Sequence, residues 1–152
     1  MQRKITCALA AFTVLLGGAL TATAEPSAED AKDYRAAIMT SLKGHIVASS
    51  MIVRGLIDND GYLVEHAKGL ENSVGEIHRV FQHGSNVDES KALPGIWEDA
   101  EKFAAAIAKS EEATVAFTKA AASGDAEAIG GAFRNVGMSC SGCHDDFRMA
   151  DD

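Results

Sequence analysis

Apolar residues recur at intervals of three and four along most of this chain, and this helical spacing constrains the fold more than any other feature. No stretch alternates between apolar and polar residues with the period of a β-strand, and the chain has only two prolines, Pro26 and Pro94. Turn-forming residues divide the pattern into four segments. The sequence therefore predicts an all-α fold.

The four predicted helices run from about 27 to 57, from 62 to 81, from Pro94 to a stop at Gly124, and from an N-cap at Asp125 through the cysteine-containing segment. Short connections between amphipathic helices make an antiparallel four-helix bundle the economical architecture. The predicted inward side chains include Ile38, Met39, Leu42, Ile46, Val53 and Leu56 in the first helix, Leu63, Leu70, Val74, Ile77 and Phe81 in the second, Trp97, Phe103, Ile107, Val115 and Phe117 in the third, and Ile129, Phe133 and Val136 in the fourth.

Residues 1–24 have the pattern of a cleaved signal peptide. Arg3 and Lys4 precede the apolar stretch CALAAFTVLLGGAL, and a small-x-small triplet ends at Ala24. The apolar stretch is too short to be a good membrane span. It could instead form one face of a buried helix, but the basic start and small-residue end favour export. We expect cleavage after Ala24, a single mature domain of residues 25–152 without a membrane span, and a periplasmic location.

The mature chain is strongly acidic. Loss of Arg3 and Lys4 with the signal peptide changes the formal charge from −8 to −10. Such a surface repels nucleic acid phosphates and anionic membranes, and it suits a basic partner. Only Cys140 and Cys143 remain of the three cysteines. Because a single cysteine pair does not make a disulfide scaffold, the presence of these two cysteines has to be explained by the chemistry of their thiols.

Cys140, Cys143 and His144 form a Cys-x-x-Cys-His motif eight residues before the end of the chain. In an exported protein this motif meets the requirements of covalent haem attachment. The two thiols can add to the two vinyl groups of haem, and the adjacent imidazole can ligate the iron. On a helix the motif continues the apolar face of Val136 and Phe133, so the pattern predicts a haem in the interior of the bundle.

Other uses of the cysteine pair have less support. A structural zinc site needs four nitrogen or sulfur ligands, and no second pair stands at matching spacing. A thioredoxin-like site expects a preceding strand, and a disulfide across two residues would stabilise little. Met149 follows His144 on the same element, so a second axial ligand of a haem iron has to come from upstream.

The chain resembles the class II cytochromes c, the cytochrome c-prime family, over essentially its whole mature length. The landmarks are Tyr34-Arg35 followed by Met39, Phe81-x-x-Gly84-Ser85, Ala92-Leu93-Pro94-x-Ile96-Trp97, Gly124-Asp125, and Cys140-x-x-Cys143-His144 with Phe147-Arg148 behind it.

This resemblance implies a four-helix bundle with one covalent haem c, His144 as the proximal iron ligand, and often a homodimer built on the first two helices. The family divides over the sixth iron ligand. High-spin members leave the iron five-coordinate and open to small gases such as nitric oxide, whereas low-spin relatives place a methionine there and carry electrons. The distal position falls four residues after Arg35, on Met39. A thioether suits haem iron, although a methionine that merely fills the core remains the alternative.

The resemblance also implies that Arg35 and Arg148 lie near the haem propionates or over the proximal side, since a guanidinium can pair with a carboxylate through two hydrogen bonds. An ordinary helix-end arginine remains open for Arg148. Helical geometry directs His45 away from Met39. The histidines expected to be ordinary surface, interface or loop residues are His45, His66, His78 and His83.

The resulting hypothesis is a periplasmic monohaem c-type cytochrome, not an enzyme, that transfers single electrons to redox partner proteins with His144 and Met39 on the iron. The alternative is a five-coordinate, high-spin cytochrome that binds nitric oxide or carbon monoxide.

Overall fold

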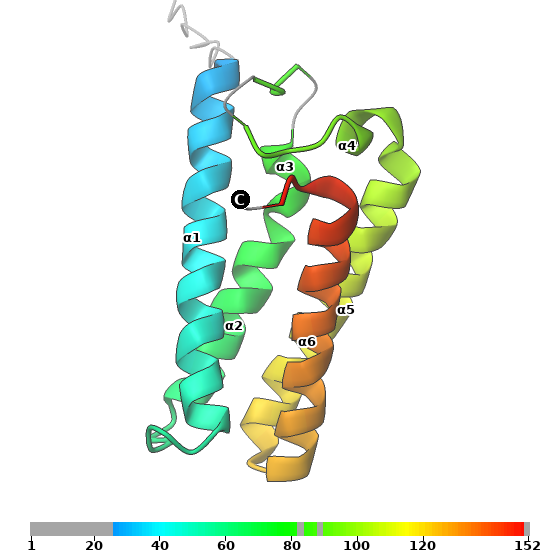
Figure 1. Cartoon of the computed structure of the whole chain (residues 1–152). Helices are drawn as coiled ribbons and strands as arrows, with labels where there is room; N and C mark the ends of the chain where they lie inside the picture. Colours follow the sequence, from blue (N-terminus) through cyan, green and yellow to red (C-terminus); the bar gives the residue numbers. More distant parts are fainter. Residues whose placement is uncertain (1–25, 82–83, 88–89, 151–152) are drawn as a thin grey trace, which may run out of the picture.

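The computed structural model describes residues 26–81, 84–87 and 90–150, and this part of the chain is helical without a named strand (Figure 1). The predicted signal peptide, residues 1–24, and His83 lie outside the described residues. The helices are α1 (Ala28–Val53), α2 (Tyr62–Gly75), α3 (Ile77–Val80), α4 (Gly95–Glu98), α5 (Ala100–Ser123) and α6 (Ala126–Phe147).

The four long helices form the predicted antiparallel bundle. Helix α1 packs mainly on α2, α2 packs also on α5, and α5 packs on α6 (Figure 1). The single-turn helices α3 and α4 lie at the same end of the bundle as the carboxyl terminus. The predictions of an all-α fold and of a four-helix bundle are therefore confirmed.

The first helix ends four residues earlier than predicted. Arg54 is its C-cap, and Gly55 follows with a φ of 69°, a left-handed conformation that glycine adopts at little cost. Leu56 therefore leaves the helical face and is 57% exposed. The prediction that Leu56 is buried was wrong, because a helical pattern in the sequence continues past the residue at which the backbone turns.

The second and third predicted helices are each interrupted. Glu76 separates α2 from α3, and Asp99 separates α4 from α5. The Asp99 side chain accepts a hydrogen bond from the backbone N–H of Lys102 at 3.0 Å and so caps α5. Pro94 is the N-cap of α4 rather than a residue of its first turn. The third segment is therefore a short turn followed by a newly capped helix.

Helix caps that the sequence predicts do form at the other boundaries. Ser27 and Asp30 make a capping box at the start of α1. Gly124 ends α5 with a φ of 73°, and the Asp125 side chain accepts from the N–H of Ala128 at 2.9 Å to begin α6. These caps fix where α6, the helix with the cysteine motif, begins.

The core consists of two clusters of buried side chains. The turn-end cluster, near the α1–α2 and α5–α6 turns, contains Leu63, Ala67, Leu70, Phe117, Ala121, Ile129 and Val136. The tail-end cluster, near the carboxyl terminus, contains Val74, Ile77, Ile96, Phe103, Ile107 and Phe147.

Helix α1 is apolar over much of its length but little buried. Its most apolar window of 18 residues has a mean hydropathy of 1.4, and 6% of that window is buried. By length and composition alone α1 could cross a membrane, although the core helix of a water-soluble protein passes the same test. The absence of a membrane span from the mature chain stays a prediction.

Candidate functional site

The two cysteines of the motif lie on α6 at the junction of the two core clusters. Both side chains are half-buried, and neither forms a disulfide. Cys140 packs against the turn-end cluster, and Cys143 packs against the tail-end cluster. Two free thiols one helical turn apart, each beside apolar side chains, fit covalent attachment of a flat apolar group such as haem.

Burial raises the pKa of both thiols. For Cys140 burial is the largest cause, and a hydrogen bond with Ser139 acts in the opposite direction. For Cys143 the charges of Cys140 and Asp146 add to the effect of burial. Both thiols are therefore protonated at neutral pH.

His144 lies in the last turn of α6 and is exposed, unlike the two cysteines. The expectation that all three motif residues share one inward face therefore holds only in part. Val136 is fully buried and Phe133 is half-buried against Phe117, so the inward face of α6 is the predicted one up to the cysteines. His144 lies at the edge of that face.

The end of α6 is tied to the segment that precedes α4. The Phe147 carbonyl accepts from the N–H of Leu93 at 3.0 Å, and the N–H of Met149 donates to the Lys91 carbonyl at 2.8 Å. Lys102 of α5 adds an ion pair to Asp146 at 3.0 Å. These contacts hold the last turn of α6, and with it the motif, against the bundle although few residues follow.

Met39 of α1 lies in the same neighbourhood as the motif. Its half-buried side chain packs against the tail-end cluster, which Cys143 contacts from α6. Aromatic rings line this region in edge-to-face pairs, with ring centroids 5.0 Å apart for Phe81 and Phe103 and 5.1 Å apart for Phe103 and Phe147. The structure thus places Met39 and Cys143 against the same cluster of buried side chains, whereas Cys140 contacts the other cluster.

Arg35 is 5% exposed, and its guanidinium holds the chain segments that follow α3. It donates to the Val80 carbonyl at 3.3 Å, to the Ser85 Oγ at 2.8 Å and carbonyl at 2.9 Å, and to the Ser90 Oγ at 3.3 Å. The guanidinium carbon also lies 5.1 Å from the centre of the Phe81 ring. Burial lowers the pKa of Arg35.

These contacts give Arg35 a structural role that its position in the sequence motif did not reveal. A haem propionate contact for Arg35 stays a prediction. Arg148 is half-buried just after α6, where it forms an isolated antiparallel bridge with Ala92 and its Nη1 approaches the Met149 carbonyl at 3.5 Å. A haem contact for Arg148 also stays a prediction.

Two histidines predicted to be ordinary surface or interface residues contact each other between α1 and α2. The Nδ1 atoms of His45 and His66 lie 3.2 Å apart, and both side chains are half-buried. The prediction of an ordinary surface position for His66 was therefore wrong. A glycine inside a predicted helix, Gly69, was the signal in the sequence, because it leaves room for a neighbouring ring.

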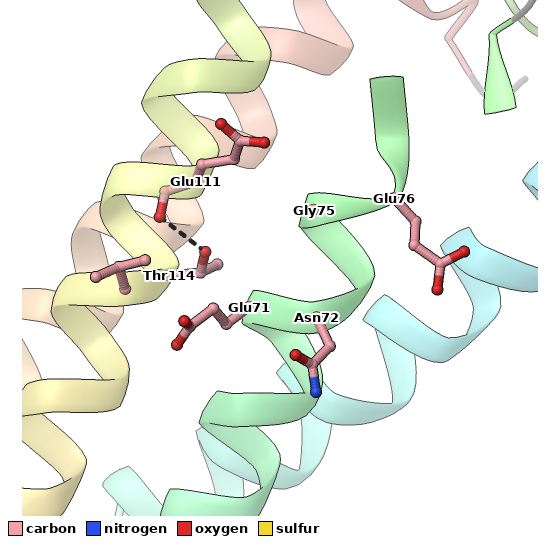
Figure 2. Close-up of a pocket in the computed structure, with 7 residues that line it drawn as sticks. Glu71, Asn72, Gly75, Glu76, Glu111 and Thr114 are labelled. Atoms are coloured by element: carbon pink, nitrogen blue, oxygen red, sulfur yellow. Dashed lines mark hydrogen bonds between the residues drawn. The ribbon is translucent and has the colours of Figure 1, made fainter. Parts of the chain in front are cut away.

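A cavity in the described structure lies away from the motif. It has a volume of about 530 Å³ and is lined by residues of α2 and α5, and Figure 2 shows Glu71 of α2 pointing toward α5, which carries Glu111 and Thr114. The polar lining includes no residue of the motif, so we do not assign this cavity to a haem. Among the described residues, no three His, Cys, Asp or Glu side chains are grouped to hold a metal ion.

Comparison with known proteins gives consistent matches along the chain. The cytochrome C' family profile matches residues 30–148. A cytochrome c' from Rhodospirillum rubrum is 27% identical over 150 residues, which is 97% of each chain. The nitric oxide complex of a variant cytochrome c' from Alcaligenes xylosoxidans superposes with a TM-score of 0.77 at 28% identity, covering 82% of this chain and 98% of that one. A carbon monoxide-bound variant from the same organism has the same TM-score, identity and coverage.

The order of helices, the inward cysteines of α6 and the match over residues 30–148 agree with one another. The chain therefore belongs to the cytochrome c' family, whose members carry one covalently bound haem c.

Proposed function

We propose that this chain is a periplasmic monohaem cytochrome c' that binds a diatomic gas, nitric oxide or carbon monoxide, on the side of the haem opposite His144. Bound haem supplies the iron to which such gases bind. The similarity to the nitric oxide and carbon monoxide complexes from Alcaligenes xylosoxidans, which covers nearly the whole of those chains, favours gas binding.

The observation that carries the proposal is the shared neighbourhood of Cys143 and Met39 in the tail-end cluster. Cys140 and Cys143 would hold the haem through thioether bonds on α6. His144 would ligate the iron from the same helix, and Met39 of α1 would lie on the other side. The aromatic side chains of the tail-end cluster would exclude water from this region and lower its polarity.

Arg35 acts in this proposal as a positioning residue. It lies one helical turn before Met39 on α1, and its hydrogen bonds attach that turn to the segment after α3. The position of the distal side chain relative to α6 therefore depends on a buried guanidinium rather than on packing alone.

Single-electron transfer is the second candidate function, and the identity of the distal residue favours it. A methionine sulfur, such as that of Met39, would raise the potential of haem iron if it were bound to it. Bonding of this sulfur to the iron would close the position that a gas needs. The two candidates therefore differ in whether Met39 ligates the iron or only lies beside it.

An optical spectrum of the reduced, haem-loaded protein with and without carbon monoxide separates the two functions. Gas binding predicts a high-spin spectrum that shifts on adding carbon monoxide, both in the wild type and in Met39→Ala. A wild-type spectrum that is low-spin and indifferent to carbon monoxide, and that becomes responsive in Met39→Ala, would contradict gas binding and support the electron carrier. Met51→Ala is the matched control, because Met51 is an exposed methionine on the same helix.

We also propose a homodimer through the outer side of α1 and the turn that follows it. Exposed apolar side chains gather in this part of the sequence, namely Val47, Met51, Leu56, Ile57 and Tyr62. Burial of such side chains against a second copy would be favourable. Sedimentation of the wild type and of Val47→Asp tests this, with a loss of dimer expected in the variant. A wild-type monomer at all accessible concentrations would contradict it.

A further inference from the structure

We propose that His45 of α1 and His66 of α2 form a two-imidazole site for a divalent cation of the zinc class. The site uses neither the cysteines nor Met39, so it does not depend on the proposed gas or electron chemistry. Imidazole nitrogen is a common ligand for zinc, copper and nickel ions. Two protein ligands leave the other positions of the ion to water, so this site differs from a closed structural zinc site with four protein ligands.

The spacing of the two nitrogens fits a shared ion. The Nδ1 atoms are 3.2 Å apart. Two nitrogens that each lie about 2.0–2.1 Å from one tetrahedral zinc are separated by about 3.3–3.4 Å. The ring planes are inclined by 57° with centroids 5.4 Å apart, so the two imidazoles do not stack. Modest ring rotations would direct both nitrogen lone pairs at one ion.

The neighbouring helix is shaped around the His45 ring. A Cβ atom added at Gly69 of α2 would lie 2.4 Å from two atoms of that ring, much closer than a non-bonded contact allows. A glycine inside a helix costs about 1 kcal/mol relative to alanine. Because Gly69 has no Cβ atom, the His45 ring can lie beside His66. The contact between α1 and α2 therefore accommodates the imidazole pair.

The protonation state favours metal binding at neutral pH. Burial, followed by the charge of His66, lowers the pKa of His45. The His45 imidazole is therefore neutral above its usual titration range, which is the form that donates a lone pair to a metal.

A third polar side chain lies one turn along α1. Ser49 is fully buried, and its hydroxyl has no hydrogen-bond partner among the described residues. Helical hydroxyls elsewhere in this chain, such as those of Thr40 and Ser110, donate to the carbonyl four residues earlier. A water molecule on an ion at the imidazole pair would supply the partner that Ser49 lacks.

Titration calorimetry of the haem-loaded protein with Zn²⁺ at pH 7.5 tests the site. We expect one ion per chain, and at least tenfold weaker binding in His66→Gln and in His45→Gln. His78→Gln is the matched control, because His78 is exposed on α3, and it should bind as the wild type does. An unchanged haem spectrum in each variant shows that the fold is intact. Wild-type zinc binding that is undetectable, or that persists in His66→Gln, would overturn the proposal.

A second variant tests the geometry without removing a ligand. Gly69→Ala keeps both imidazoles but places a methyl group where the His45 ring lies, so zinc binding should weaken at least fivefold. Binding by the wild type should also weaken as the pH falls below about 6.5, since protons then compete for the nitrogens. Wild-type affinity in Gly69→Ala, or an affinity independent of pH between 7.5 and 5.5, would contradict the assignment.

Discussion

The turn-end and tail-end clusters of the bundle are built differently. In the turn-end cluster Leu63, Leu70 and Phe117 are at most 1% exposed. In the tail-end cluster Ile77 and Phe103 are 8% exposed, close to the 7% of Ile129 in the turn-end cluster, so the clusters differ in their side chains rather than in their burial. Phe117 is the one ring among the buried side chains of the turn-end cluster, with half-buried Phe133 beside it. The tail-end cluster contains the rings of Phe103 and Phe147, with half-buried Phe81, Trp97 and Met39 beside them.

We infer from this difference in rings that a large apolar group would lie mainly against the tail-end cluster, on the side of α6 that carries Cys143. Incompletely covered apolar side chains gain free energy when such a group removes their remaining surface from water. The tail-end cluster and the two cysteines are thus the part of the molecule that a haem would complete, and the predictions below test this contrast.

Replacement of both cysteines by alanine should have the largest effect. The double variant Cys140→Ala/Cys143→Ala should lack covalent haem entirely, and the tail end should lose protection because its cluster is then incomplete. Hydrogen exchange measures this, with faster exchange expected for amides of α3, α4 and the last turns of α6. An equal increase in the exchange rates of amides around Phe117 would contradict the contrast between the two clusters.

Truncation of a side chain in the turn-end cluster should lower the free energy of unfolding without changing the haem spectrum. Phe117 is fully buried, so Phe117→Ala in the haem-loaded protein should lower the free energy of unfolding by about 3–5 kcal/mol. Its haem spectrum should stay that of the wild type. Phe103→Ala is the matched change in the tail-end cluster and should alter the haem spectrum. Denaturant unfolding and optical spectra check both, and the reverse pattern would contradict the account.

Removal of the buried guanidinium should have a smaller effect. Arg35→Met leaves the Val80 carbonyl and the Ser85 acceptors without their donor. We expect a loss of about 3 kcal/mol in the free energy of unfolding, measured in denaturant. Arg79→Met is the control, since Arg79 is exposed and its ion pair with Glu76 at 3.9 Å should contribute below about 1 kcal/mol. Equal losses of unfolding free energy in Arg35→Met and Arg79→Met would contradict the positioning role of Arg35.

The smallest effect should come from the titration of His45. Its pKa in the folded protein is lowered by burial and then by His66. Folded protein therefore binds the His45 proton less readily than unfolded protein does, and stability should fall as the pH drops below the usual histidine pKa of about 6.5. The shift of the denaturant midpoint between pH 7.5 and 5.5, in metal-free buffer, should be larger in the wild type than in His45→Gln. An equal shift of the midpoint in the wild type and in His45→Gln would contradict the assignment of this pH dependence to His45.

Local sequence signals predicted the architecture and the attachment motif. The periodicity of apolar residues predicted the four long helices, and Gly124 with Asp125 predicted the last boundary, because caps act over a few residues. The breaks at Glu76 and Asp99 were not predicted, since each leaves the apolar pattern uninterrupted. At Asp99 the break coincides with a local cap, the hydrogen bond that its side chain accepts from the N–H of Lys102.

Contacts between distant segments could not be obtained from the sequence. The hydrogen bonds of Arg35 reach residues 45 to 55 positions away, and the His45–His66 contact depends on the crossing of α1 and α2 beside Gly69. The position of Met39 beside the cluster that Cys143 contacts follows the predicted helical face, but its role at the iron depends on a cofactor that no side-chain pattern fixes.

Mass spectrometry of the chain exported by a host that matures c-type cytochromes tests the central claim most directly. The account predicts an intact mass of residues 25–152 plus one haem, and a peptide containing Cys140 and Cys143 that carries the adduct. A bare polypeptide, or haem lost on denaturation without a covalent adduct on that peptide, would contradict it.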